Sequence, residues 1–117
     1  MSMDKDWVAI CPLSDILPWT GVAARIDGQQ VAIFRTGEND IFVVGNHDPF
    51  SGANVISRGI VGDIDGELVV ASPVYKQHFR LSDGICVEDD STSIGSWPAR
   101  LFDGVVVVGR HQQVHAA

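Results

Sequence analysis

The sequence predicts a small all-β domain made of antiparallel sheets and hairpins, with at most one or two short helical turns. Short runs rich in Val, Ile and Phe recur along the 117 residues, and the dipeptide Asp-Gly occurs four times between them. Asp-Gly tolerates the positive φ angles that tight hairpin turns require. No segment keeps a helical period over more than two turns, which argues against a helical bundle or a βαβ fold.

The individual elements follow from these runs and from the residues that separate them. Hairpin turns are expected at Gly28, at residues 36–40 and at Asp103-Gly104, and helical turns only at residues 13–17 and 53–57. The expected strands are Trp7–Cys11, Val22–Ile26, Val31–Arg35, Ile41–Gly45, Glu67–Ala71, His78–Leu81, Ala99–Phe102 and Val105–Gly109.

Length and composition indicate one globular domain. Hydrophobic residues make up 45% of the chain and charged residues 20%, which is typical of a folded protein with a modest core. We expect residues 1–110 to form this domain and residues 111–117 to form a loose C-terminal tail. Two cysteines, Cys11 and Cys86, lie far apart without a Cys-x-x-Cys pair, so we expect them to be free thiols.

The charge balance excludes some classes of partner. Eight basic and fifteen acidic residues give a net charge of -7, which disfavours binding to nucleic acid or to anionic lipid. The longest aliphatic run, Val105–Val108, is far too short for a transmembrane helix. The acidic start Met1–Asp6 contains no apolar run and therefore does not predict a secretory signal. A cytoplasmic protein is expected.

Two segments contain most of the information about function. The first reads Asn-His-Asp-Pro-Phe over residues 46–50, and the second reads Ser-Pro-Val-Tyr-Lys-Gln-His-Phe-Arg-Leu over residues 72–81. Their prolines, their aromatic residue and the glycines that follow resemble the two cluster-binding loops of Rieske domains. The 21 residues between Phe50 and Ser72 are more than such domains usually place there, and they predict an extra hairpin around residues 64–66.

The residues at the cluster-ligand positions are unsuitable for a cluster. A Rieske two-iron centre needs two thiolates on one iron and two imidazoles on the other. At the four positions that the resemblance identifies, this sequence has Asp48, Phe50, Ser72 and Tyr75. We therefore expect no iron–sulfur cluster and no other metal or cofactor in this chain.

Within the Rieske superfamily, the sequence resembles the small subunits of cytoplasmic NAD(P)H-dependent nitrite reductases. The segments that carry this resemblance are Asn-x-Asp-Pro-Phe-Ser at 46–51 and Ser-Pro-Val-Tyr-Lys-Gln at 72–77. The resemblance implies a partner, the large subunit, which carries FAD, sirohaem and an iron–sulfur cluster and reduces nitrite to ammonia with electrons from NAD(P)H. This chain has no Gly-x-Gly-x-x-Gly motif for a nicotinamide cofactor, and the resemblance implies no catalytic residue in it.

The candidate docking residues lie in or near the two loops. Phe50 and Tyr75 are expected either to fill the space of the missing cluster or to contact the partner. Basic residues are scarce in this chain, so their grouping after Tyr75 predicts a docking patch, although a solvated polar face is the alternative. The full set of candidates is Phe50, Arg58, Tyr75, Lys76, His78 and Arg80.

Three alternatives remain open from the sequence. His47, Asp48 and His78 offer N and O donors for a mononuclear metal, whereas Asp48 alone can cap the backbone of its own loop. The domain can also be a Rieske-type ferredoxin that transfers electrons, which the missing ligands disfavour, or a stand-alone protein-binding domain, because a fold does not fix a function. The tryptophans Trp7, Trp19 and Trp97 are expected to pack in the core or at sheet edges.

Overall fold

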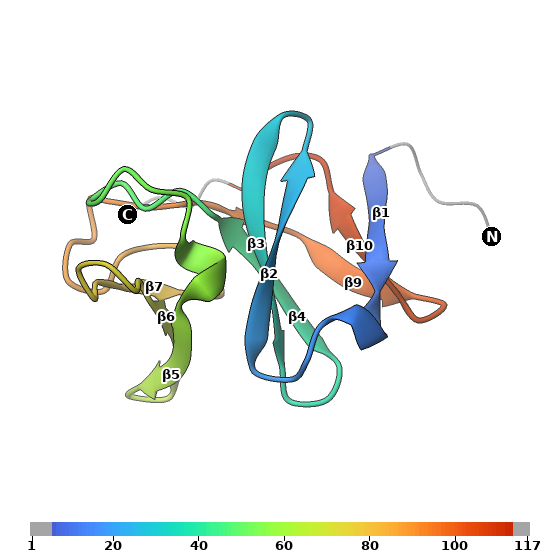
Figure 1. The fold of residues 1–117 in the computed structure, drawn as a ribbon, viewed down its shortest axis with the longest axis horizontal. Helices are drawn as coiled ribbons and strands as arrows, with labels where there is room; N and C mark the ends of the chain where they lie inside the picture. The colour runs from blue at the N-terminus through green and yellow to red at the C-terminus, as the bar shows by residue number, and fades with distance from the viewer. Residues whose placement is uncertain (1–5, 114–117) are drawn as a thin grey trace.

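The computed structural model describes residues 6–113, and their strands form three antiparallel sheets (Figure 1). The strand orders are β1-β10-β9, β2-β3-β4-β8 and β5-β6-β7. Two 3₁₀ turns, η1 (Leu13–Asp15) and η2 (Ile56–Arg58), are the helical elements of the described chain. The strands are β1 (Trp7–Pro12), β2 (Thr20–Ile26), β3 (Gln29–Thr36), β4 (Asp40–Gly45), β5 (Ile60–Ile64), β6 (Glu67–Ala71), β7 (His78–Arg80), β8 (Ser96–Trp97), β9 (Ala99–Phe102) and β10 (Val105–Gly109). The predicted all-β class is confirmed.

Three of the four Asp-Gly pairs close two-residue hairpin turns. In the turn between β2 and β3, Asp27 has a φ of 50° and Gly28 a φ of 86°, as a type I′ turn requires. The pairs at residues 65–66 and 103–104 close β5–β6 and β9–β10 in the same way. At Asp83-Gly84 only the glycine has a positive φ, because the Asp83 carboxylate accepts a hydrogen bond from the Ile85 N–H (3.0 Å).

Strand β3 divides the core into two clusters because it is buried on both faces. Val31 and Ile33 face a cluster that contains Trp97 and lies against β1 and β10. Ala32 and Phe34 face the other cluster, which reaches toward β6 and β7. This double burial explains why β3 is continuously apolar over residues 31–34 and does not alternate.

The structure departs from the sequence-based expectation at several places. The second helical turn lies at Ile56–Arg58 and not at 53–57. The predicted hairpin around residues 64–66 is present, and its first strand is β5, which was not predicted as a strand. Strand β8 was not predicted, because two residues give no periodic pattern. Trp97 is buried as expected. Trp19 is 54% exposed and directly precedes β2, the edge strand of its sheet, so it lies at a sheet edge and not in the core.

The expected C-terminal tail is described only in its first three residues. Within that part, the Gln113 N–H donates a hydrogen bond to the Ser96 carbonyl (2.7 Å), which places residues 111–113 beside β8. The remaining tail residues, 114–117, lie outside the described part of the chain. No helix among residues 6–113 is long and apolar enough to cross a membrane.

The loops named by the sequence lie together at one end of the molecule. Residues 46–55 (loop 1) follow β4, and residues 72–77 (loop 2) follow β6. Figure 1 shows both loops on its left-hand side, beside the β5-β6-β7 sheet and away from β1 and β10. The three sheets therefore act as a scaffold that presents the two loops as a tip.

Candidate functional site

Loop 1 is fixed at its base by a buried asparagine. Asn46 is 1% exposed, and its side-chain oxygen accepts a hydrogen bond from the Ser57 N–H (2.8 Å). Its Nδ2 donates to Gln30 Oε1 (3.1 Å), while its carbonyl accepts from the Ile56 N–H (3.2 Å). The start of loop 1 is thereby joined both to η2 and to β3.

Asp48 stands at the centre of the tip. Its side chain is fully buried and accepts hydrogen bonds from the Phe50 N–H (2.9 Å) and from the Ser72 hydroxyl (2.5 Å). Burial alone would raise the pKa of this carboxyl. The hydrogen bonds from Ser72, Phe50 and Ser51 outweigh that effect and hold the pKa below its ordinary value. Asp48 is thus a buried carboxylate that caps its own loop and is bonded to the other one.

Loop 2 closes on itself through Ser72. The Ser72 N–H donates to the Gln77 carbonyl (2.9 Å), and the Ser72 carbonyl accepts from the Lys76 N–H (3.2 Å). The hydroxyl also accepts a hydrogen bond from the Val74 N–H (3.3 Å). Lys76 has a φ of 68°, which turns the chain back toward β7. Tyr75 consequently lies exposed within a short turn that is closed by backbone hydrogen bonds.

These residues do not fit an iron–sulfur cluster. Asp48 and Ser72 occupy the positions where thiolates would be required, and they bind each other instead. Phe50 and Tyr75, at the imidazole positions, offer a phenyl ring and a phenol. The tip therefore keeps the two-loop frame of a cluster site with a hydrogen bond between its loops, which disfavours the ferredoxin alternative.

A mononuclear metal site is not assembled either. Among residues 6–113, no group of three or more His, Cys, Asp and Glu side chains comes together. His47 is exposed and bonded to Asn54 Oδ1 (3.0 Å), His78 is bonded to Glu88, and Asp48 is buried with Ser72. The three donors that the sequence suggested thus point to three different partners.

The aromatic residues of the tip are exposed to different degrees. Phe50 is 36% exposed and packs on the buried Phe79 with ring centroids 6.2 Å apart, so it partly covers the core. Tyr75 is 62% exposed and Val74 44%. Ile60, which pairs with Ala71 one residue before loop 2, is 74% exposed.

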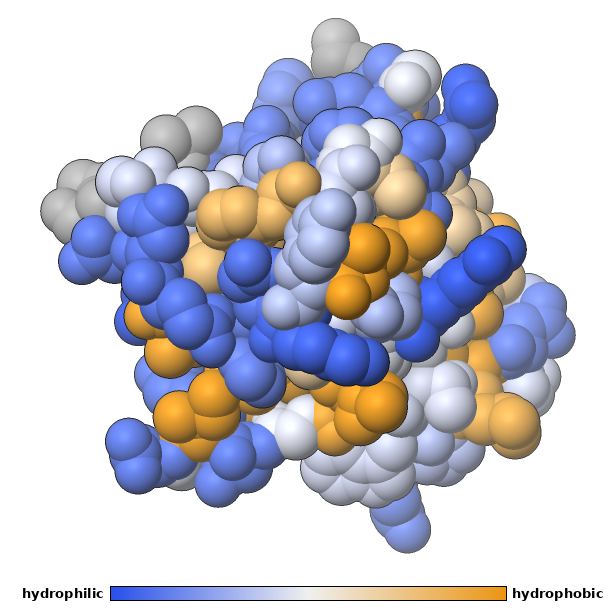
Figure 2. Space-filling view, turned by 60° about the vertical axis from the view of Figure 1, so that its left-hand side comes forward, coloured by the Kyte–Doolittle hydropathy of each residue, from blue (hydrophilic) through white to orange (hydrophobic). Residues whose placement is uncertain are grey.

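Sequence reasoning missed Val74 and Ile60 as surface residues. An aliphatic residue in or beside a strand is normally assigned to the core, and only its exposure in the structure shows that it lies at the surface. Figure 2 shows apolar surface interspersed with strongly hydrophilic side chains over the end of the molecule that it brings forward. Exposed apolar groups bordered by polar ones are the composition expected of a binding surface.

The basic residues of the tip are not equivalent. His78 Nδ1 lies 2.6 Å from Glu88 Oε2, and Arg80 binds Asp83 through two nitrogens (2.8 and 3.1 Å). Burial would raise the pKa of Glu88, but hydrogen bonds from the His78 N–H and its ring lower it overall. Arg58 and Lys76 form no ion pair with a carboxylate of residues 6–113. In the predicted basic patch, Arg80 is therefore paired with a carboxylate and His78 is hydrogen-bonded to one, whereas Arg58 and Lys76 have no carboxylate partner within residues 6–113.

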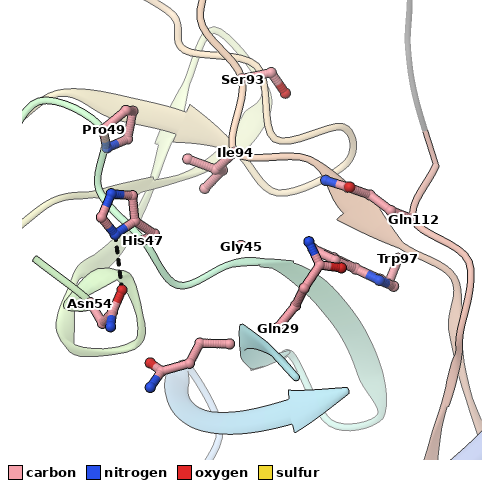
Figure 3. Close-up of a pocket in the computed structure, with 10 residues that line it drawn as sticks. Gln29, Gly45, His47, Pro49, Asn54, Ser93, Ile94, Trp97 and Gln112 are labelled. Carbon is pink, nitrogen blue, oxygen red and sulfur yellow. Dashed lines mark hydrogen bonds between the residues drawn. The ribbon is translucent and has the colours of Figure 1, made fainter. Parts of the chain in front are cut away.

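A pocket of about 380 Å³ lies beside the tip (Figure 3). It is bounded by loop 1, by the start of β3 and by the segments around residues 93–97 and 112. Figure 3 shows His47 and Asn54 on one side of it, Gln112 and Trp97 on the other, and Gln29 between them. No pattern in the sequence indicates this pocket, because its residues come from four separate segments.

Comparison with known proteins defines the family. The model of the Rieske-like [2Fe-2S] domain matches residues 6–109. The nitrite reductase (NADH) small subunit of Salmonella typhimurium is 54% identical over 103 residues, which cover 87% of this chain and 95% of that protein. The NMR structure of the Escherichia coli protein NirD superposes with a TM-score of 0.82 at 50% identity and covers 87% of this chain and 94% of that one.

A further relative has a different architecture. The nitrite reductase [NAD(P)H] large subunit of Klebsiella oxytoca is 41% identical over 108 residues, which are 92% of this chain but only 11% of that protein. A segment like this chain is therefore one part of that much longer polypeptide. Together with the family match, the high identities and the shared fold, this shows that the chain belongs to the Rieske-like domain family and, within it, to the nitrite reductase small subunits.

Proposed function

We propose that this chain is the small, non-catalytic subunit of an NAD(P)H-dependent nitrite reductase, which reduces nitrite to ammonia. In this proposal it binds a large subunit that carries FAD, sirohaem and an iron–sulfur cluster and takes its electrons from NAD(P)H. The chain itself supplies no redox group, because the residues at its cluster positions are not cluster ligands. The complex would operate in the cytoplasm and involve neither nucleic acid nor membrane, in line with the net charge of -7.

The observation that carries the proposal is the segment shared with the Klebsiella oxytoca large subunit. There, a stretch 41% identical to this chain belongs to the same polypeptide as the rest of the large subunit. Covalent linkage keeps two domains at a high effective concentration, and separate chains need an interface to achieve the same proximity. We infer that this chain meets its large subunit through such an interface.

The tip is the surface that we assign to this interface. Tyr75, Val74 and Ile60 are exposed, and Phe50 is half covered by Phe79. The hydrogen bond between Asp48 and Ser72 holds the two loops in place, so little conformational entropy is lost when a partner binds. Tyrosine and arginine are enriched at interfaces, whereas lysine is depleted there, which gives Tyr75 the larger expected role.

The basic residues around the tip would guide the encounter. Lys76 and Arg58 form no ion pair with carboxylates of the described chain, so both can face acidic groups of a partner. Arg80 is paired with Asp83 and contributes less net charge, and His78 is hydrogen-bonded to Glu88. Charges of this kind mainly change the association rate and its dependence on salt.

The test is a titration of the purified large subunit with this chain. Isothermal calorimetry would follow binding, and NADH- or NADPH-dependent nitrite reduction would follow turnover in the same samples. The proposal predicts saturable binding with a fixed stoichiometry and a change in nitrite reduction that saturates at the same ratio. Absence of a complex at the highest concentration that keeps both chains soluble would refute it.

A further inference from the structure

One of the residues that line the pocket beside the tip has a buried hydrogen-bond donor without an acceptor. Trp97 is 5% exposed, and its Nε1–H finds no partner among residues 6–113. A buried donor that has given up water without gaining another acceptor is unfavourable, and buried tryptophan N–H groups usually have a partner. Since Trp97 lines the pocket, a group that enters the pocket is a natural source of the missing acceptor.

The lining indicates what kind of group fits. It contains no Asp, Glu, Lys or Arg. The His47 ring is already bonded to Asn54 Oδ1 (3.0 Å). The remaining polar groups are mainly side-chain amides, which both donate and accept hydrogen bonds: Gln29, Gln30, Asn54 and Gln112. An uncharged group with a carbonyl oxygen, such as a peptide main chain or a side-chain amide, complements such a lining.

The location favours a protein segment over a free small molecule. Small-molecule sites are lined mainly by apolar side chains, whereas the walls of this pocket are almost evenly polar and apolar. His47 and Pro49 line the pocket and directly flank Asp48, the residue that joins the two loops of the tip. A partner seated on the tip would therefore have the pocket at the edge of its footprint.

The pocket can admit such a group without unfolding. Gln29 and Gln112 are exposed, so their side chains can rotate at its opening. The Gln112 amide lies directly against Gly95, where a Cβ atom would overlap it. Gly95 has a φ of 78°, which glycine adopts readily, and its lack of a side chain leaves room for this amide.

We propose that this pocket receives an uncharged, carbonyl-bearing segment of the large subunit, whose oxygen accepts a hydrogen bond from Trp97 Nε1–H. The inference rests on the proposed function, because it needs the large subunit as the partner. The inference adds a specific contact at the edge of the tip. It also assigns a role to the Trp97 Nε1–H, which has no acceptor among residues 6–113.

The experiment uses the chain labelled with ¹⁵N-tryptophan and titrated with the unlabelled large subunit. The indole N–H signal of Trp97, assigned with Trp97→Phe, should move and exchange with water more slowly in the complex. The signal of Trp7, which lies under Arg100 on β9, should keep its position apart from broadening. An unmoved Trp97 signal in a complex that has formed would overturn the inference and leave the proposed function intact.

A matched pair of variants tests the pocket independently of the tryptophan. Gln112→Glu places a negative charge in the pocket, where it would repel the carbonyl oxygen of the large subunit. Gln113→Glu adds the same charge at the next residue, which does not line the pocket. Both side chains are exposed, so both variants should fold. We expect Gln112→Glu to bind the large subunit about tenfold more weakly and Gln113→Glu to bind like the wild type. Equal affinities would overturn the inference, and failure of the wild type to bind would refute the proposed function itself.

Discussion

Asp48 Oδ2 and Ser72 Oγ lie 2.5 Å apart, fully buried, and join the two loops through residues that are 24 positions apart in the sequence. They occupy the two positions at which the resemblance to Rieske domains places thiolate ligands. Where those domains tie their loops together through iron and sulfide, this chain ties them through a hydroxyl and a carboxylate. A hydrogen bond to a charged acceptor is stronger than one between neutral groups, which suits this role.

The first prediction concerns this link. Asp48→Ala leaves the Ser72 hydroxyl and the Phe50 N–H without their acceptor, and should lower the free energy of unfolding by about 3 kcal/mol. Asp48→Asn, which can still bond both groups, should cost only about 1 kcal/mol. Urea unfolding of the three proteins measures both values. Equal losses in the two variants would contradict this expectation, because they would show that an amide of the same size cannot replace the carboxylate.

The second prediction concerns pH. Because the pKa of Asp48 is lowered in the folded chain, its ionised form stabilises the fold above the unfolded pKa of about 3.9. This stabilisation is lost as the pH falls through the lower folded value. The difference in unfolding free energy between the wild type and Asp48→Asn should therefore be constant near neutral pH and shrink below about pH 4. The other carboxylates cancel in this difference, so a difference that does not change down to pH 3 would contradict the assignment.

The third prediction concerns Phe50. A fully buried phenylalanine would cost about 3–5 kcal/mol on truncation, but Phe50 is 36% exposed and packs on Phe79 at one side. We expect Phe50→Ala to cost about 1–2 kcal/mol and Phe79→Ala, which empties a fully buried position, about 3–5 kcal/mol. Thermal and urea unfolding would compare the two. Similar costs would mean that Phe50 belongs to the core.

The fourth prediction is chemical. After anaerobic incubation with iron and sulfide, the protein should remain colourless and contain no stoichiometric iron, because a carboxylate, a phenyl ring, a hydroxyl and a phenol replace the ligands. A Rieske ferredoxin treated in parallel is the positive control. Visible absorption typical of a two-iron centre in this chain would contradict the prediction.

The sequence was sufficient to predict most of the strands and the hairpin turns. Asp-Gly pairs specify hairpins locally, and three of the four behave in this way. The exception, Asp83-Gly84, makes local interactions of another kind, because the Asp83 carboxylate accepts a hydrogen bond from the Ile85 N–H and pairs with Arg80. Strand β8 was missed because its pairing with β4, not its own two residues, makes it a strand.

The site was predictable in its positions but not in its geometry. The resemblance named Asp48, Phe50, Ser72 and Tyr75, yet only the structure shows that two of them bind each other while Tyr75 faces outward. The hydrogen bond between His78 and Glu88 joins residues ten positions apart, and no local pattern reveals their proximity. The exposed Ile60 and Val74 resemble core residues in the sequence and were missed for that reason.

The surface around Trp19 is a natural comparison for the tip. Leu17 is 70% exposed and Trp19 is 54% exposed, and Trp19 adopts a φ of 66° that its N–H stabilises by donating to the Arg35 carbonyl (2.6 Å). This segment lies between η1 and β2, outside loops 1 and 2. It is therefore a second exposed aromatic surface on the same domain, with no part in the proposed docking.

The affinity of the large subunit for Tyr75→Ala and for Trp19→Ala tests the central claim most directly. Both variants remove one exposed aromatic side chain, so both should leave the domain folded. If the tip is the docking surface, Tyr75→Ala should dissociate about tenfold faster, and Trp19→Ala should bind within about twofold of the wild type. Wild-type binding by Tyr75→Ala together with weakened binding by Trp19→Ala would contradict the claim and move the interface to the other surface.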